Sequence, residues 1–362
     1  MHRVTVAVDP PYDVVVGPGA AAELRAVVGP FRRVVVVSQA RVLDEHRAAL
    51  GDAFGREPWI VTIGDGEAAK SLSTVEALCG ELARGGLLRG DLVVAFGGGV
   101  VGDTAGFAAA VYHRGVAVAQ VPTTVLGQVD AAIGGKTAVN LAEGKNLVGA
   151  FHQPIAVIAD TTILATLPDA EFRSGLGEVA KYAVMPEGDG IVDLLRLHTD
   201  RVLARDPVVL ADLVAACAAI KANVVAEDPE ERIGAERGAD GAGRASLNYG
   251  HTFAHALETT GAYSFAHGEA VAVGLIFAVN LARALERVGL DAVDRVHGVV
   301  AGLGLPVSVP GDADRAELLV TMRRDKKATG GLTFVLPGPS GLELVDDPPD
   351  RALDAAFAAV GA

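Results

Sequence analysis

The sequence of 362 residues is poor in cysteine, in aromatic side chains and in positive charge. Its two cysteines, Cys79 and Cys217, both fall in apolar segments, and neither has a second cysteine nearby. This spacing excludes a disulfide framework and a thiolate metal site, and it indicates a reducing compartment. With a formal net charge of -14, the chain lacks the broad basic face that nucleic acids and anionic membranes require.

Two further absences concern membranes and export. No uncharged apolar run approaches the roughly 18 residues that span a bilayer. The N-terminal segment MHRVTVAVDPPYDVVV has the pattern of a strand and lacks the features of a signal peptide. We therefore expect a cytoplasmic protein. The length and a hydrophobic content of 50% allow two domains with sizeable cores.

The first half of the chain alternates short apolar runs with helical patterns. Strands are predicted at 4–8, 13–16, 33–37, 58–63, 92–96 and 116–121, with helices near 41–50 and 71–83. This alternation predicts a parallel sheet with helices on both faces, which binds ligands at the carboxyl ends of its strands. Beyond about residue 165 helical patterns dominate, so we expect an α/β protein with domains at 1–165 and 166–362.

A glycine-rich segment at 97–103, GGGVVGD, follows a predicted strand and opens a helix. It satisfies G-x-G-x-x-G, and its backbone N–H groups are suited to a pyrophosphate. Two earlier strand–helix units precede it, however, and the next strand ends in Val121-Pro122 without an acidic residue for a ribose. We interpret it as a nucleotide site of variant geometry; the alternative is a tight turn that needs glycine only for its backbone.

Residues 121–154 are dense in glycine and small polar side chains, which is typical of a ligand-binding segment. Thr123 and Thr124 offer hydroxyls, and Asp130 is the acid of the segment. Lys136 and Lys145 follow glycines that let a ligand come close. In an acidic protein these cations predict a phosphorylated substrate beside a nucleotide, with solvated surface charges as the alternative.

Three of the nine histidines lie between residues 251 and 267. His251 and His255 are four apart and share one face of a helix, and His267 precedes a second helical pattern. Three protein ligands with an open position are typical of catalytic zinc, so the segment predicts a metal site. Ordinary polar residues at helix starts are the alternative.

Two helical segments carry charges that need an explanation. Glu178 and Lys181 lie three apart on a predicted helix, and a surface ion pair is the simplest interpretation. Lys221 lies among apolar residues, where an ammonium group requires a partner.

The motifs GGGVVGD, VPTT, GGKT, GKN, GEVAKY, LNYGHTFAHALE, HGEA and DKK occur in this order along the chain. Their combination closely resembles the 3-dehydroquinate synthases, which are sugar phosphate cyclases. The resemblance implies an α/β fold with an N-terminal Rossmann-like parallel-sheet domain that binds NAD. It also implies a C-terminal mainly α-helical domain that holds a divalent metal, zinc or cobalt, an active site in the cleft between the domains, and a homodimer.

The resemblance further implies roles for individual residues. The metal ligands would be Glu178, His251 and His267, so His255 would assist at the substrate and not bind the metal. NAD would contact Asp65, Gly66, Glu67, Lys70, Gly98, Gly99, Val100, Val101, Gly102, Asp103, Thr123, Thr124, Lys136, Lys145, Ile163, Leu164, Ala165 and Thr166. Catalysis and substrate binding would involve Asp130, Lys136, Asn146, Lys181, Lys221, Arg244, Asn248, His255 and Lys326. Arg114 would reach the site of a neighbouring subunit, and a ligand carboxylate would be the partner of Lys221.

The implied reaction converts 3-deoxy-D-arabino-heptulosonate 7-phosphate to 3-dehydroquinate and phosphate. Transient oxidation by NAD precedes phosphate elimination, and reduction and an aldol closure follow. Three alternatives stay open: another cyclase such as an aminodehydroquinate or 2-epi-5-epi-valiolone synthase, a metal-dependent polyol dehydrogenase that releases NADH, and a non-catalytic binding protein. The set Lys221, Arg244, Asn248 and His255 favours a substrate with a carboxylate, although an amino analogue would satisfy it too.

Overall fold

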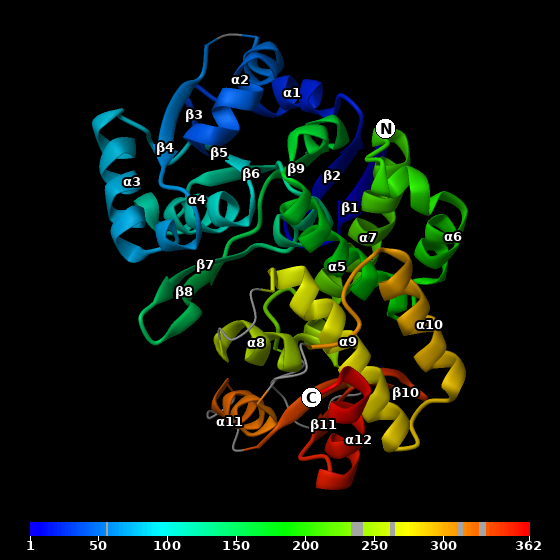
Figure 1. Cartoon of the computed structure of the whole chain (residues 1–362). Coiled ribbons are helices and arrows are strands. Elements are labelled where there is room, and N and C mark those ends of the chain that lie inside the picture. Colours follow the sequence, from blue (N-terminus) through cyan, green and yellow to red (C-terminus); the bar gives the residue numbers. More distant parts are fainter. Residues whose placement is uncertain (56, 233–241, 261–264, 310–313, 326–330) are drawn as a thin grey trace. The chain divides into compact units, whose positions relative to one another are not determined.

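The computed structural model describes residues 1–55, 57–232, 242–260, 265–309, 314–325 and 331–362. The chain forms two compact units (Figure 1): the first contains Met1–Pro168 and Ala204–Ala226, and the second contains Asp169–Leu203 and Glu227–Ala362. The expected domain boundary at residue 165 lies close to Pro168, where the chain first passes from the first unit to the second. Residues 204–226 were expected in the second domain but belong to the first, because helix α7 (Pro207–Glu227) is bonded there. The Thr161 hydroxyl, for example, donates to the carbonyl of Pro207 over 2.7 Å.

A seven-stranded sheet in the order β1-β2-β9-β6-β5-β3-β4 organises the first unit. The pair β1–β2 is antiparallel and the other pairs are parallel. The strands are β1 (His2–Val6), β2 (Tyr12–Gly17), β3 (Val34–Gln39), β4 (Trp59–Ile63), β5 (Leu92–Gly97), β6 (Ala117–Pro122) and β9 (Ala156–Asp160). The helices of this unit, besides α7, are α1 (Leu24–Val28), α2 (Ala40–Phe54), α3 (Leu72–Arg84) and α4 (Gly99–Val111). The predicted strands are all present, whereas β9 was not predicted.

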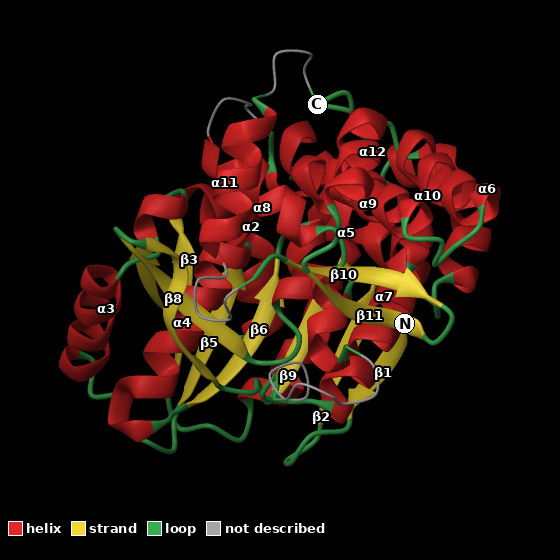
Figure 2. Ribbon diagram, turned by 90° about the horizontal axis from the view of Figure 1, so that it is seen from below, coloured by secondary structure: helices red, strands yellow, loops and turns green. Residues whose placement is uncertain are grey.

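Strand β3 shows why the sheet is covered on both faces. Val34 and Val36 pack into one core with α1 and α2, and Val35 and Val37 pack into a second core with α3 and α4. Successive side chains of a strand point to opposite faces, so an unbroken valine run indicates burial on both. Figure 2 shows the strands of the sheet side by side in yellow and the helices in red.

The strand order reverses between β3 and β5. From β3 the chain continues to β4 on one side, whereas β5 pairs with the other side of β3 and leads on to β6. Open α/β sheets bind ligands outside the carboxyl ends of their strands at such a reversal. The glycine turn at the end of β5 lies at this position.

Residues 121–154 form elements that the sequence did not reveal. A single π-helical turn, η4 (Gly127–Ala131), is followed by an antiparallel hairpin of β7 (Lys136–Leu141) and β8 (Gly144–Phe151). The fully buried Val139 packs in the same core as α4. Short 3-10 turns complete the unit: η1 (Ala20–Glu23), η2 (Glu67–Ala69), η3 (Tyr112–Arg114) and η5 (Thr161–Thr166).

Helix α7 is long and apolar enough to cross a membrane by length and composition alone. However, 67% of its most apolar window is buried inside the protein. This burial is typical of a core helix.

The second unit is built around α9 (His267–Ala284), which packs against α5 (Asp169–Val184), α8 (His251–Thr260), α10 (Leu290–Gly302) and α12 (Asp350–Val360). Its other described elements are α6 (Asp189–Leu203), α11 (Arg315–Asp325), the 3-10 turn η7 (Gly243–Asn248) and the hairpin of β10 (Thr333–Gly338) and β11 (Gly341–Asp346). Phe277 of α9 stacks on Phe253 of α8 with ring centroids 4.3 Å apart, and Phe357 of α12 meets its edge. This aromatic core fixes the relative positions of α8 and α9.

Candidate functional site

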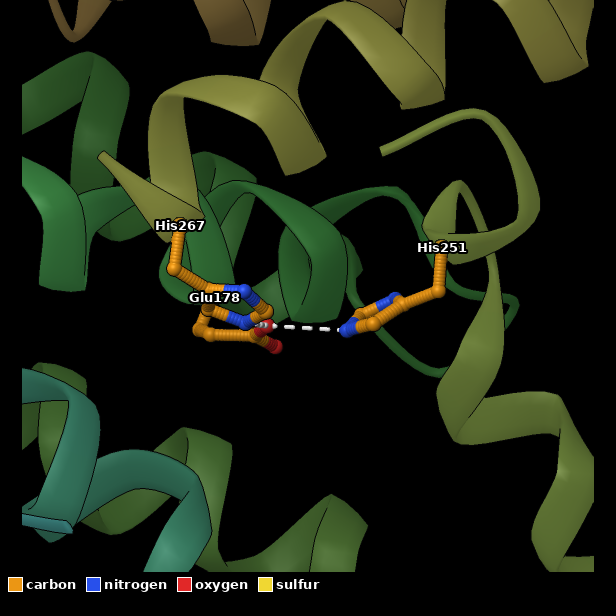
Figure 3. A group of neighbouring side chains, drawn as sticks. All are labelled: Glu178, His251 and His267. Atoms are coloured by element: carbon orange, nitrogen blue, oxygen red, sulfur yellow. Dashed lines mark ion pairs between the residues drawn. The ribbon is translucent and has the colours of Figure 1, made fainter. Parts of the chain in front are cut away.

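Three side chains from three helices of the second unit converge on one point (Figure 3). Glu178 comes from α5, and His251 and His267 are the first residues of α8 and α9. Oε1 of Glu178 lies 3.3 Å from Nε2 of each histidine, and the three candidate ligand atoms lie within 4.8 Å of one another. The structure thus brings the predicted ligand set together, and metal binding by it stays a prediction.

Glycines allow the helices to approach closely enough for this convergence. A Cβ atom at Gly268 would lie 1.6 Å from the carbonyl oxygen of Ser174, and one at Gly177 would lie 2.1 Å from the carbonyl oxygen of Gly268. On the other side of α9, a Cβ atom at Gly274 would lie 2.1 Å from the carbonyl oxygen of Gly250, which has a φ of +81°. The backbones of α5 and α8 therefore both touch α9 beside the cluster.

The cluster is highly charged, with Glu178 and His251 buried and His267 half-buried. Glu178 and Lys181 form an ion pair of 2.5 Å with side chains only 1% exposed, so the interpretation as a surface pair is wrong. Burial raises the pKa of Glu178, but Lys181 and His251 outweigh it and hold that pKa well below its usual range. Burial lowers the pKa of His251. Burial also acts to lower the pKa of His267, but Glu178 and Glu258 outweigh it and raise that pKa to about 10.

The donor set suits a divalent cation. Neither oxygen of Glu178 receives a hydrogen bond of normal geometry from the described residues, although Oε2 lies within ion-pair distance of Lys181 and Oε1 lies within ion-pair distance of His267. Two imidazole nitrogens point at the same buried carboxylate, which is the nitrogen and oxygen combination that zinc accepts with a fourth position open. A metal ion would satisfy all three groups at once.

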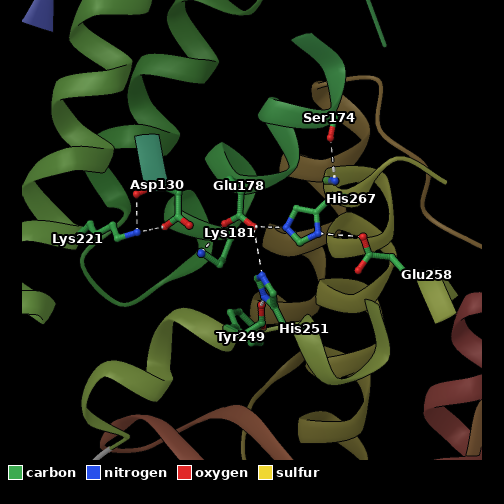
Figure 4. A network of polar contacts seen from close by, with 10 residues as sticks. Asp130, Ser174, Glu178, Lys181, Lys221, Tyr249, His251, Glu258 and His267 are labelled. Carbon is green, nitrogen blue, oxygen red and sulfur yellow. Dashed lines mark hydrogen bonds and ion pairs between the residues drawn. The ribbon is translucent and has the colours of Figure 1, made fainter. Parts of the chain in front are cut away.

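Each histidine of the cluster is oriented through its other ring nitrogen (Figure 4). Nδ1 of His251 lies 3.2 Å from the carbonyl oxygen of Tyr249, and Nδ1 of His267 lies 3.2 Å from Oε1 of Glu258. Both Nε2 atoms are thereby left facing Glu178. Glu258 was not predicted as a site residue from the sequence. The available signal was its spacing of seven residues from His251, which puts both on one face of α8.

In the first unit the glycine turn packs closely against its neighbours. Cβ atoms at Gly97 and Gly98 would lie 2.5 Å from Val101 and 3.0 Å from Thr124. Gly98 is the N-cap of α4, so the free N–H groups of that helix begin at this turn. The turn has glycines and a half-buried helix N-terminus, the combination that binds a pyrophosphate.

Next to the turn, buried Lys70 pairs with Asp103 of α4. Burial raises the pKa of Asp103, and this effect outweighs the opposing influence of Lys70. The strand that ends at Pro122 carries no acidic residue for a ribose. Asp103 on α4 instead provides a carboxylate in the predicted NAD region.

The other predicted NAD residues differ in exposure. The side chains of Ile163 and Leu164 are 5% and 0% exposed, so both serve the core of the unit. Thr123 is also buried, and its N–H bonds to the carbonyl of Gly97. The exposed members are Asp65, Gly66, Glu67, Lys136, Lys145, Ala165 and Thr166.

The predicted substrate residues of the first unit form one ion pair and one set of exposed side chains. Lys221 donates to Oδ1 of Asp130 over 2.8 Å. The expected partner of Lys221 was a ligand carboxylate; in the structure it is the carboxylate of Asp130, because η4 presents that side chain to α7. Lys136, Asn146 and Arg114 are exposed, and the latter two have positive φ values of 56° and 62°.

In the second unit the predicted substrate residues differ in burial: Lys181 and Arg244 are buried and His255 is half-buried. The Arg244 side chain is 1% exposed; its guanidinium donates to the carbonyl of Pro229, and its N–H donates to Asp228. The ring of His255 meets that of His251 edge-on at 5.5 Å. Asn248 is exposed, and Lys326 lies outside the described residues.

The chain is similar to known proteins over most of its length. Residues 60–174 match the family model described as 3-dehydroquinate synthase N-terminal, and residues 175–328 match its C-terminal counterpart. The chain is 49% identical over 340 residues to a putative aminodehydroquinate synthase of Amycolatopsis mediterranei (strain S699), covering 93% of this chain and 88% of that one. It is 44% identical over 342 residues to the 3-dehydroquinate synthase of Mycobacterium leprae (strain TN), covering 92% and 90%.

A solved structure is similar over the whole length. It is a 2-deoxy-scyllo-inosose synthase complexed with carbaglucose-6-phosphate, NAD+ and Co2+, 26% identical, with a TM-score of 0.86 and coverage of 99% of this chain and 100% of that one. The two family models together cover more than half of the chain, and the curated relatives cover nearly all of it. By sequence over nearly its whole length, this chain belongs to the 3-dehydroquinate synthase family of enzymes.

Proposed function

We propose that the protein converts 3-deoxy-D-arabino-heptulosonate 7-phosphate to 3-dehydroquinate and phosphate, with NAD and one divalent metal ion as cofactors. The observation that carries the proposal is the buried cluster of Glu178, His251 and His267 in a chain of this family. The neighbouring structure that contains NAD+, Co2+ and a phosphorylated sugar analogue supports the cofactor assignment. A cytoplasmic location and a homodimer, in which Arg114 reaches the neighbouring site, stay predictions of the resemblance.

The cofactors and the protein have separate tasks. A bound metal would polarise a sugar hydroxyl, and NAD would reversibly take up the hydride of the carbon that carries this hydroxyl, so that NAD would be regenerated in each turnover. Glu178, His251 and His267 would hold the metal, and the turn at Gly98 with the N-terminus of α4 would hold the pyrophosphate of NAD. The protein itself supplies binding and orientation.

Three cationic side chains are suited to bind a substrate that carries both a phosphate and a carboxylate. Lys181, Lys221 and Arg244 are buried cations, and each is already held by carboxylate or carbonyl oxygens within its own unit. Fixed cations in low-dielectric surroundings bind phosphate and carboxylate strongly, because they need little reorganisation. We assign Lys181, Lys221 and Arg244 to substrate orientation and to stabilisation of the departing phosphate. Asp130 fixes the Lys221 ammonium group.

A second candidate is the aminodehydroquinate synthase reaction. The 49% identity to a putative enzyme of that name favours it, since the 3-dehydroquinate synthase of Mycobacterium leprae is 44% identical. Both substrates would carry the phosphate and the carboxylate that the cations recognise. The two candidates therefore differ only in how the protein contacts one hydroxyl or amino group.

A phosphate-release assay tests the proposal. The metal-loaded protein is incubated with the heptulosonate phosphate and a catalytic trace of NAD, and phosphate and NADH are followed together. We expect stoichiometric phosphate without net NADH, and no phosphate from the matched variant Glu178→Gln. Steady accumulation of NADH would instead indicate a polyol dehydrogenase.

The same assay separates the two candidates when the amino analogue replaces the heptulosonate phosphate. We expect a higher kcat/KM for the hydroxyl substrate. A higher kcat/KM for the amino substrate would replace the proposed reaction with the second candidate and would leave the roles of metal and NAD intact.

A further inference from the structure

One carboxylate beside the cluster has no role in the proposed reaction. Glu258 lies on α8, seven residues after His251, so the two side chains leave the helix on the same face. Its Oε1 lies 3.2 Å from Nδ1 of His267 at the start of the neighbouring helix, and its side chain is only 13% exposed. Figure 4 shows the imidazole of His267 between the carboxylates of Glu258 and Glu178.

The two histidines of the cluster are supported unequally. His251 has the neutral carbonyl of Tyr249 at Nδ1, and its side chain is 11% exposed, so packing also holds its ring. His267 is 31% exposed and has the charged acceptor Glu258 at Nδ1. A ring that packing holds less firmly depends more on its hydrogen bond for orientation. A carboxylate acceptor also makes the opposite nitrogen a stronger donor to a metal than a carbonyl acceptor does.

We propose that Glu258 is a positioning residue for His267: by accepting the Nδ1–H it fixes the tautomer and the plane of the ring, so that Nε2 points at the cation beside Glu178. The inference depends on the metal-binding role of the cluster in the proposed function. It assigns the last residue of the segment HTFAHALE to the metal site, although that residue does not bind the metal.

Direct titration with Co2+, followed by its visible absorption bands, tests the role without any turnover. Loss of a carboxylate of this kind lowers metal affinity by about 10- to 100-fold, which we expect for Glu258→Ala. Glu258→Gln keeps an acceptor oxygen and the side-chain volume but loses the charge, and should lie between Glu258→Ala and the wild type. In the wild type with Zn2+ bound, nitrogen-15 NMR of the imidazoles should show the Nδ1–H form of His267, and Glu258→Ala should weaken that preference.

Glu269 offers a matched control. It carries the same charge two residues after His267, but its carboxylate accepts the N–H of Ala266 over 3.1 Å and caps α9. Glu269→Gln should bind Co2+ as the wild type does. Equal affinities of the wild type and Glu258→Gln, or equal losses in Glu258→Gln and Glu269→Gln, would overturn the positioning role.

The outcomes also separate this role from the proposed function. If the wild type and both Glu258 variants bind Co2+ equally well, only the positioning role is refuted. A wild type that binds neither Co2+ nor Zn2+ refutes the metal site and the inference together. If Glu258→Ala does not fold, the Co2+ affinity of the isosteric Glu258→Gln tests the positioning role.

Discussion

Replacement of Gly268 by alanine should open the metal cluster although it changes no ligand. The new Cβ would lie 1.6 Å from the carbonyl oxygen of Ser174, whereas ordinary contacts begin at 3.4 Å, so α9 must move from α5 by about 1.8 Å. Overpacking of this kind costs about 1–3 kcal/mol, and the hydrogen bond from Gly268 N–H to Ser174 Oγ contributes about 0.5–1.5 kcal/mol more. We therefore expect a destabilisation of about 1.5–4.5 kcal/mol.

The shift of α9 should affect metal binding more than it affects the free energy of unfolding. Metal sites tolerate deviations of about 0.2 Å in their ligand distances, so a shift of α9 that carries His267 away from Glu178 should abolish tight metal binding. Urea unfolding of the second unit and metal content after dialysis measure the two effects. Gly298→Ala is the control, because its Cβ would meet no atom within 4 Å on helix α10, and it should stabilise by about 0.5–1 kcal/mol. A Gly268→Ala protein with the stability and metal content of the wild type would refute the close-approach argument.

Two further predictions concern single charges. His267→Ala should lose its metal while the fold survives, and unchanged metal content by atomic absorption would contradict the ligand assignment. Lys70→Met should leave the half-buried Asp103 without its cation and raise the pKa of that carboxyl further. An acid whose folded pKa exceeds the unfolded value loses stability as the pH rises through its folded pKa. The stability deficit of Lys70→Met should therefore be small near about pH 4 and grow towards neutral pH. A deficit independent of pH would show that charge burial is not its cause.

The sheet was predictable because its strands carry strong patterns, and the hairpin was missed because its strands do not. Residues 34–37 form an unbroken apolar run, and β3 is buried along its whole length. In β7, by contrast, Lys136 and Leu141 are exposed and Val139 is fully buried, so the apolar pattern is too short to predict a strand. β8 is mostly exposed, and its glycines and polar residues were interpreted as a ligand-binding loop.

Contacts distant in sequence account for the remaining differences. Lys221 looked like a buried cation in a helical domain, but its partner Asp130 belongs to a turn far earlier in the chain, and α7 joins the first unit accordingly. Helical spacing put Glu178 and Lys181 on one face but could not show that α9 covers that face. Periodicity predicts which residues share a face, whereas burial depends on which element packs against it.

The residues that indicated the metal site are of two kinds, metal-binding side chains and neighbouring glycines, and the structure shows a different role for each. Each proposed ligand stands next to a glycine in the chain: Gly177 precedes Glu178, Gly250 precedes His251, and Gly268 follows His267. At all three glycines a Cβ atom would meet the backbone of another helix at 2.9 Å or less. The donors define the chemistry, and the glycines let three helices approach until those donors share one point. A chain with the same donors but larger residues at these positions would therefore match the ligand set without forming the site.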